Sequence, residues 1–157
     1  MHERNILLVE DNAKDEALTL RALRKSNILN RVDVVRDGAE ALDYLFAAGL
    51  DGEAKLASLP MLVLLDLKLP KVDGLEVLRC IRADARTQLM PVVILTTSTE
   101  DSDRLQGYKF GANSYVRKPM DFGQFVAAVN QLGLYWLVLN EPPPAPGPEA
   151  VEGHGHE

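Results

Sequence analysis

Cysteine is nearly absent from this 157-residue chain, which contains only Cys80. A single cysteine cannot form a disulfide bond within the chain, which favours a reducing compartment. No apolar stretch of about 18 residues is visible, and no basic segment followed by an apolar one opens the chain. We therefore expect a cytoplasmic protein without a membrane partner.

Positive charge is also scarce. The formal net charge is −6 at pH 7, and lysine and arginine do not cluster anywhere along the chain. Proteins that bind DNA or RNA non-specifically need a basic surface to neutralise phosphates, so nucleic acid is excluded as an expected partner. The hydrophobic content of 46% over 157 residues suits one domain with one core.

Apolar segments that predict strands alternate with segments of helical periodicity. Strands are expected at 5–10, 32–35, 62–66, 92–95 and 114–117, and helices at 13–25, after 37, after 73, at 101–111 and after 121. Three of these helices should begin at Asp37, Asp73 and Asp121, each followed three residues later by Glu or Gln, because the aspartate side chain can accept the free amide hydrogens of a first turn. Residues 49–60 are expected to form a polar loop.

The predicted strands are built mainly of apolar residues and show no regular alternation with polar ones. This pattern is typical of strands buried on both faces, in a parallel sheet covered by helices on each side. The fold class is therefore α/β, with a doubly wound five-stranded sheet and right-handed crossovers. In such sheets the reactive side chains gather beyond the carboxyl ends of the strands.

Chemically useful side chains stand at those strand ends. Glu10 and Asp11 end the first strand, Asp66 ends the third, Thr96 follows the fourth, and Lys118 follows the fifth. Any one of these acids could be only a helix cap or a turn residue. Together they indicate a site that binds a divalent cation and handles a phosphoryl group.

Four motifs, in this order, resemble the receiver domain of two-component response regulators, and the match spans roughly residues 4–132. The motifs are Val9-Glu10-Asp11, the segment Leu65–Gly74, Thr96-Thr97-Ser98 and the segment Tyr115–Pro119. The resemblance implies a flavodoxin-like strand order, 2-1-3-4-5. The long loop before Pro60 and the apolar ending at 134–143 are similar to those of single-domain regulators paired with bacterial phytochromes.

The resemblance also implies a role for each motif residue. Asp66 would accept a phosphoryl group from a phosphohistidine of a sensor histidine kinase, for which a bacteriophytochrome is the candidate. Lys118 would pair with the phosphate, and the Thr96 hydroxyl would bond to it after transfer. Mg²⁺ would be held by Glu10, Asp11, Asp66 and the backbone carbonyl of Lys68, with Glu10 commonly acting through water. Such a protein catalyses only its own phosphotransfer and autodephosphorylation, and is not otherwise an enzyme.

Further implied features concern regulation. Thr96 and Tyr115 would form a switch, in which the tyrosine ring turns inward once phosphate draws the hydroxyl toward it. A cis peptide bond before Pro119 would aim the lysine. Lys68 and Ser98 occupy positions that tune the loss of phosphate in the family.

The expected domain covers residues 1–140 and includes an apolar extension at 134–140, which should pack on its own domain or on a second copy. The family commonly dimerises, so we expect a homodimer through the Asp101–Leu132 face together with this extension. Residues 141–157, rich in proline and glutamate, should be extended or disordered.

Two other functions remain open. A haloacid-dehalogenase-like phosphatase also uses a strand-end aspartate, Mg²⁺ and a lysine, but that family needs a second acid where Lys68 stands. A receiver-like scaffold that never accepts phosphate is the other alternative.

Overall fold

The computed structural model describes residues 5–46, 59–119 and 121–144. Five parallel strands form one sheet in the order β2-β1-β3-β4-β5, which confirms the expected fold class and strand order. The strands are β1 (Ile6–Val9), β2 (Val32–Val35), β3 (Leu62–Leu65), β4 (Val92–Thr96) and β5 (Ser114–Arg117). Their positions agree with the sequence prediction to within one or two residues.

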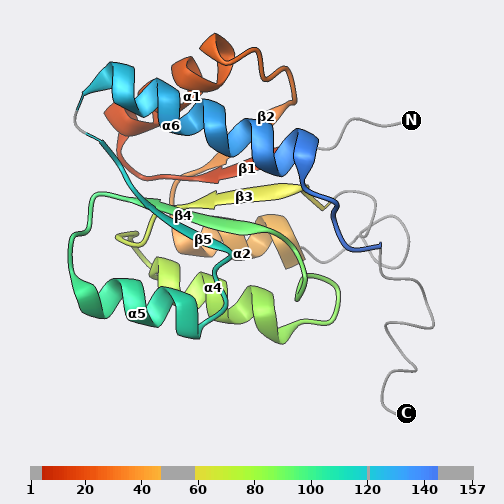
Figure 1. Cartoon of the computed structure of the whole chain (residues 1–157). Coiled ribbons are helices and arrows are strands. Elements are labelled where there is room, and N and C mark those ends of the chain that lie inside the picture. Colours follow the sequence, from red (N-terminus) through yellow and green to blue (C-terminus); the bar gives the residue numbers. More distant parts are fainter. Residues whose placement is uncertain (1–4, 47–58, 120, 145–157) are drawn as a thin grey trace.

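Helices cover both faces of the sheet (Figure 1). On one face lie α1 (Ala13–Lys25) and α6 (Phe122–Gly133), and on the other lie α2 (Gly38–Phe46), α4 (Gly74–Ala83) and α5 (Asp101–Lys109). Each strand is followed by a helix, so all the strands run in the same direction. Their carboxyl ends therefore meet at one edge of the sheet.

The predicted helix starts are present. The side chain of Asp37 accepts a hydrogen bond from the Glu40 N–H at 2.8 Å, and that of Asp121 accepts one from the Gln124 N–H at 3.0 Å. The Asp73 carboxylate accepts one from the N–H of Leu75 at 3.0 Å. These bonds satisfy amide groups that have no partner inside their own helix.

Burial on both faces holds only for the three central strands. All residues of β1, β3 and β4 are buried, whereas β2 is buried only at Val35, and β5 runs from partly buried to exposed. The prediction of full burial is therefore wrong for β2 and β5, because each is an edge strand with one neighbour.

The apolar extension continues the last helix instead of starting a separate segment. It forms a wider, π-helical stretch, η1 (Leu134–Leu139), at the end of α6. Trp136 and Leu137 pack against the core formed by β1, β3 and β4, while Leu134, Tyr135, Val138 and Leu139 are 51%, 49%, 70% and 61% exposed. The extension thus packs on its own domain with one side only.

The helix formed by α6 and η1 corrects one expectation. Over its 18 residues, Phe122–Leu139, it is long and apolar enough by length and composition to cross a membrane. Only 17% of this stretch is buried, and Phe125 and Val129, at 2% and 1% exposure, mark the side of the helix that packs in the core. The helix packs along α1 as a layer of the fold.

The polar loop expected at 49–60 lies almost entirely outside the described residues, as do residues 145–157 of the expected tail. Residues Glu141–Pro144 are described; they are exposed and have no regular secondary structure.

Candidate functional site

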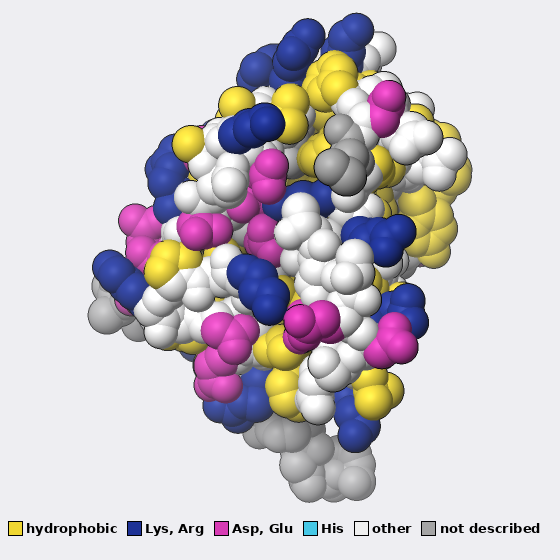
Figure 2. Space-filling model, turned by 90° about the vertical axis from the view of Figure 1, so that its left-hand side faces the viewer, with side chains coloured by type: hydrophobic (Ala, Val, Ile, Leu, Met, Phe, Trp, Pro, Cys, Tyr) yellow, Lys and Arg dark blue, Asp and Glu magenta, His cyan; other side chains and the backbone are white. Residues whose placement is uncertain are grey.

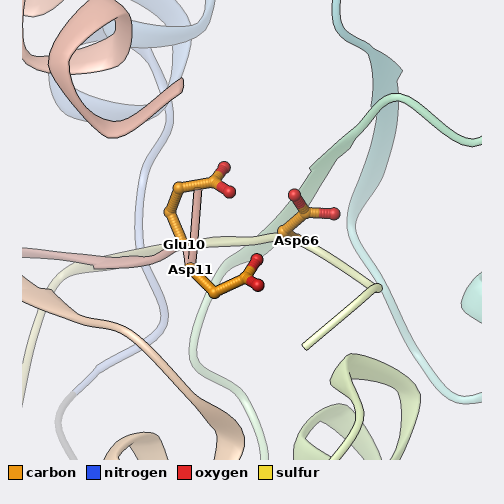
Figure 3. A group of neighbouring side chains, drawn as sticks. All are labelled: Glu10, Asp11 and Asp66. Carbon is orange, nitrogen blue, oxygen red and sulfur yellow. The ribbon is translucent and has the colours of Figure 1, made fainter. Parts of the chain in front are cut away.

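The acidic residues at the ends of β1 and β3 come together because the two strands are paired neighbours, with Val9 opposite Leu65. The N–H of Asp66 donates to the Val9 carbonyl at 3.1 Å, which holds the two strand ends in register. Glu10, Asp11 and Asp66 each offer a carboxylate oxygen, and these oxygens lie within 4.8 Å of one another (Figure 3). Glu10 and Asp66 are buried, whereas Asp11 is exposed.

Asp66 is held at both carboxylate oxygens. Oδ1 accepts hydrogen bonds from the Leu67 N–H at 2.6 Å, from the Thr96 hydroxyl at 2.8 Å and, more weakly, from the Lys68 N–H at 3.4 Å. Oδ2 accepts one from the ammonium group of Lys118 at 2.9 Å. The carboxylate, only 7% exposed, is therefore fixed in orientation before any ligand arrives.

Lys118 is the basic partner of this acidic cluster. Its Nζ lies 2.5 Å from Glu10 Oε1, 2.9 Å from Asp66 Oδ2 and 3.0 Å from Asp15 Oδ2. Burial alone would lower the pKa of Lys118, but its contacts with Glu10 and Asp66 outweigh burial and leave that pKa raised. The lysine therefore stays charged.

The peptide bond before Pro119 is not cis, since the described residues contain no cis peptide bond, and that prediction is wrong. The lysine is positioned differently. Its N–H donates to the Thr96 carbonyl at 2.8 Å, and its ammonium group is held by three carboxylates.

Negative charge is in excess at this site. Three carboxylates, on Glu10, Asp15 and Asp66, contact one ammonium group, and a fourth, on Asp11, has an oxygen within 4.8 Å of those of Glu10 and Asp66. Burial, together with repulsion from Asp66, raises the pKa of Glu10 to about 7, even though Lys118 acts to lower it. Carboxylate oxygens in excess of local positive charge fit a hard divalent cation such as Mg²⁺.

The face that contains this site carries a concentration of acidic side chains near its centre, with basic side chains among them (Figure 2). A hollow of about 470 Å³ opens beside the acidic cluster. Its lining residues are Asp11, Leu67, Lys68, Leu69, Pro70, Asp73, Leu75 and Asp103.

The two residues of the expected switch lie on neighbouring strands. Thr96 is fully buried, with its hydroxyl on Asp66. The hydroxyl group of Tyr115 is buried without a hydrogen bond of good geometry among the described residues, and its burial raises the pKa of that phenol by more than the nearby Ser98 hydroxyl lowers it. The Tyr115 ring stands 6.4 Å, centroid to centroid, from the ring of Tyr108 on α5.

The structure thus gathers Glu10, Asp11, Asp66, Thr96 and Lys118 at one edge of the sheet, as the sequence predicts. It adds two residues that the sequence analysis missed, Asp15 and Asp103. Asp15 lies in the first turn of α1, outside the motif that ends β1, and no spacing in the sequence singles it out. Asp103 belongs to no motif.

A doubly wound parallel sheet in the order 2-1-3-4-5, with a buried aspartate, a lysine and a hydroxyl group at its carboxyl edge, is the arrangement of receiver domains. The chain matches the family "Response regulator receiver domain" over residues 6–130 and belongs to that family. Receiver domains serve two-component signalling and are not enzymes in the usual sense.

Several individual proteins are similar along almost the whole chain. The probable methanogenesis regulatory protein FilR2 of Methanothrix harundinacea is 45% identical over 143 residues, covering 91% of this chain and 88% of that protein. The crystal structure of the phosphorylated cyanobacterial phytochrome response regulator RcpA has a TM-score of 0.81 at 39% identity, covering 91% of this chain and 100% of that one. The Mn²⁺-bound form of the response regulator Rcp1, a protein of Synechocystis sp., has a TM-score of 0.78 at 35% identity, covering 90% of this chain and 99% of that one.

Proposed function

We propose that this chain is a cytoplasmic response regulator that accepts a phosphoryl group on Asp66 from a sensor histidine kinase. The observation that carries the proposal is the environment of the Asp66 carboxylate. One oxygen is bonded to the Thr96 hydroxyl and the other to the Lys118 ammonium group, and two further carboxylates have oxygens within 4.8 Å. A purely structural aspartate would not need this set of partners.

Asp66, Lys118 and Thr96 each have a defined part in the proposed transfer. An Asp66 oxygen forms a bond to phosphorus while the phosphorus–nitrogen bond of the kinase phosphohistidine breaks, and the departing ring takes up a proton and leaves neutral. Lys118 pairs with the phosphoryl oxygens as a compact positive charge, and Thr96 donates its hydroxyl hydrogen to one of them after transfer. The work is mainly positioning and charge neutralisation.

Mg²⁺ is the proposed cofactor. Glu10, Asp11, Asp66 and the backbone carbonyl of Lys68 would hold it, with Glu10 acting through water, and the ion would neutralise charge on the phosphoryl oxygens. The Mn²⁺-bound form of Rcp1 supports a divalent cation in this family. The acidic excess around Lys118 supports it from within this chain.

The proposed kinase partner is a bacteriophytochrome-type sensor. The support is similarity, since RcpA is a phytochrome response regulator and matches nearly the whole of this chain. Neither a nucleic acid nor a membrane is proposed as a partner.

The proposed output is a change of surface. Phosphate on Asp66 would draw the Thr96 hydroxyl away from its present acceptor. The ring of Tyr115, whose buried hydroxyl makes no hydrogen bond of good geometry, would shift with it and move α5. A Tyr115 ring with the same nuclear magnetic resonance environment before and after phosphorylation would contradict this switch.

The affected surface is the Asp101–Leu132 face. We propose that two copies pair through this face together with the apolar extension.

Intact mass measurement after incubation with acetyl phosphate and MgCl₂ tests the proposal. We expect the wild-type chain to gain the mass of one phosphoryl group and Asp66→Asn to gain none, because the amide is not a nucleophile. Asp43→Asn, at an exposed position on α2, is the matched control and should be labelled like the wild type. Undiminished labelling of Asp66→Asn would assign phosphate to another residue, and an unlabelled wild type would favour the scaffold function.

A further inference from the structure

Asp103, in the first turn of α5, contacts two side chains that flank the phosphoacceptor. Its Oδ2 accepts a hydrogen bond from the Ser98 hydroxyl at 2.6 Å and lies 3.7 Å from the Lys68 ammonium group. Ser98 belongs to the loop after β4, and Lys68 to the loop after β3. One carboxylate on a helix therefore connects the two loops that border Asp66.

These contacts close a ring around the phosphoacceptor. The Thr96 hydroxyl donates to Asp66 Oδ1 at 2.8 Å, and the Ser98 N–H donates to Thr96 Oγ1 at 3.3 Å. The ring continues from the Ser98 hydroxyl to Asp103 and from Asp103 to the Lys68 side chain. The backbone N–H of Lys68 donates to Asp66 Oδ1 at 3.4 Å, which completes the ring.

The ring stands beside the open side of the site. Lys68 and Asp103 both line the 470 Å³ hollow, together with Asp11 of the acidic cluster and Leu67, the residue after Asp66, so their ion pair stands at the hollow that borders Asp66. The Lys68 side chain is 64% exposed and would move freely in water without a partner, whereas that of Asp103 is only 18% exposed. The better-buried carboxylate therefore acts as the anchor for the mobile lysine.

The simplest alternative is that Asp103 only favours the helix start, since an acid in a first turn interacts well with the helix dipole. Asp101 makes that comparison possible. It stands in the same turn of α5, but its side chain is 91% exposed and, within the described part of the chain, pairs with Arg104 alone. Both aspartates can interact with the helix dipole, but of the two only Asp103 contacts Ser98 and Lys68. The helix dipole therefore does not explain these contacts.

We propose that Asp103 is a positioning residue that holds Lys68 and Ser98 across the entrance to Asp66, and so limits how fast phosphoryl donors enter and how fast water removes the phosphoryl group. The proposal rests on the proposed function. Without Asp103 the two side chains lose their common anchor, and the entrance opens to both reactants.

Asp103→Ala is the test variant and Asp101→Ala its matched control, because each removes one negative charge from the first turn of α5. Two rates are measured by intact mass: the gain of phosphate from acetyl phosphate with MgCl₂, and its loss after the donor is removed. We expect both rates to rise roughly threefold or more in Asp103→Ala, because phosphoryl donors and water would reach Asp66 more easily. Both rates should stay at the wild-type values in Asp101→Ala. A purely structural role would instead lower the thermal unfolding midpoint and slow the gain of phosphate.

The double variant Ser98→Ala/Asp103→Ala tests the connection itself. Ser98→Ala and Asp103→Ala each remove the hydrogen bond between Ser98 and Asp103. The double variant should therefore gain and lose phosphate no faster than the faster of the two single variants. Rate increases that multiply in the double variant would contradict the proposed ring of contacts. Wild-type rates in Asp103→Ala would overturn the positioning role. If Asp103→Ala does not fold, Asp103→Asn, which keeps the shape but loses the charge that pairs with Lys68, decides by the same two rates. A wild-type chain that gains no phosphate would instead refute the proposed function.

Discussion

At the scale of single residues, Lys118 holds the site together while no cation is bound. Its ammonium group is the only positive charge in direct contact with Glu10, Asp15 and Asp66 among the described residues. A buried lysine among carboxylates adds little net stability as a pair, but its removal leaves buried negative charges uncompensated. The same residue can thus serve phosphoryl transfer and the stability of the resting domain.

We predict that Lys118→Met lowers the free energy of unfolding by about 3–5 kcal/mol in the absence of divalent cations, the usual cost of breaking a buried ion pair. Saturating MgCl₂ should restore more stability to this variant than to the wild type, because the ion replaces the lost positive charge. Urea unfolding with and without MgCl₂ measures both quantities. Lys109→Met, at an exposed position, is the control. A Lys118→Met protein as stable as the wild type without cations would contradict this role.

The sequence predicted the site residues that end strands and missed those that start helices. Asp66, Thr96 and Lys118 could be placed together because the carboxyl ends of parallel strands must share one edge. Asp15 and Asp103 come from first turns of helices, and whether such a residue faces the site depends on how its helix is rotated and packed. That rotation is set by contacts distant in the sequence, which no local pattern reveals.

At the scale of elements, Gly74 couples the start of α4 to the loop that carries Asp66. Its N–H donates to the Leu67 carbonyl at 3.0 Å. A Cβ atom here would lie 2.3 Å from the Asp66 carbonyl oxygen and 2.7 Å from the Leu67 Cα, both backbone atoms that cannot rotate away. The first helical residue therefore has to be glycine for the helix to start this close to Asp66.

We predict that Gly74→Ala destabilises the domain by about 1–3 kcal/mol, the usual cost of inserting a group into filled space, and slows phosphorylation of Asp66 by acetyl phosphate. Gly123→Ala is the matched control in the first turn of α6, where a Cβ would meet only the Asp121 side chain, at 3.1 Å. The higher helix propensity of alanine should leave that control neutral or slightly stabilised. Urea unfolding and the labelling rate check both. Equal stability of the two variants would argue against the close approach.

Helix starts were predictable because capping is local, whereas the end of the last helix was not. The sequence suggested an apolar extension at 134–140, separate from the helix before it, and a glycine such as Gly133 commonly follows the end of a helix. In the structure Gly133 keeps right-handed helical angles, with φ −62° and ψ −45°, and the helix continues into η1. Close packing explains the glycine, since a Cβ at this position would lie 2.2 Å from the Ile28 Cδ1 atom.

At the scale of the whole molecule, the fold followed from the sequence because rules of handedness and strand burial leave few arrangements for five strand–helix units. The pairing of two copies of the chain does not follow from such rules. The structure explains why the extension should be covered: one side of η1 packs on the domain and the other exposes Leu134, Tyr135, Val138 and Leu139. Leu105 and Tyr108 on α5 are also more than half exposed. An apolar surface of this kind is typical of a protein interface.

We predict that the wild-type chain sediments with the mass of two chains and that Leu139→Glu sediments with the mass of one, because a charge on η1 cannot be buried against a second copy without a partner. Leu89→Glu provides a matched control, since Leu89 is 64% exposed and Leu139 is 61% exposed, but Leu89 stands in the loop before β4 and belongs to neither η1 nor α5. That variant should keep the mass of two chains. Circular dichroism spectra that match the wild type show that either variant is folded. A wild-type chain that sediments as a monomer, both before and after phosphorylation, would refute the dimer, and a dimeric Leu139→Glu would move the interface away from the extension.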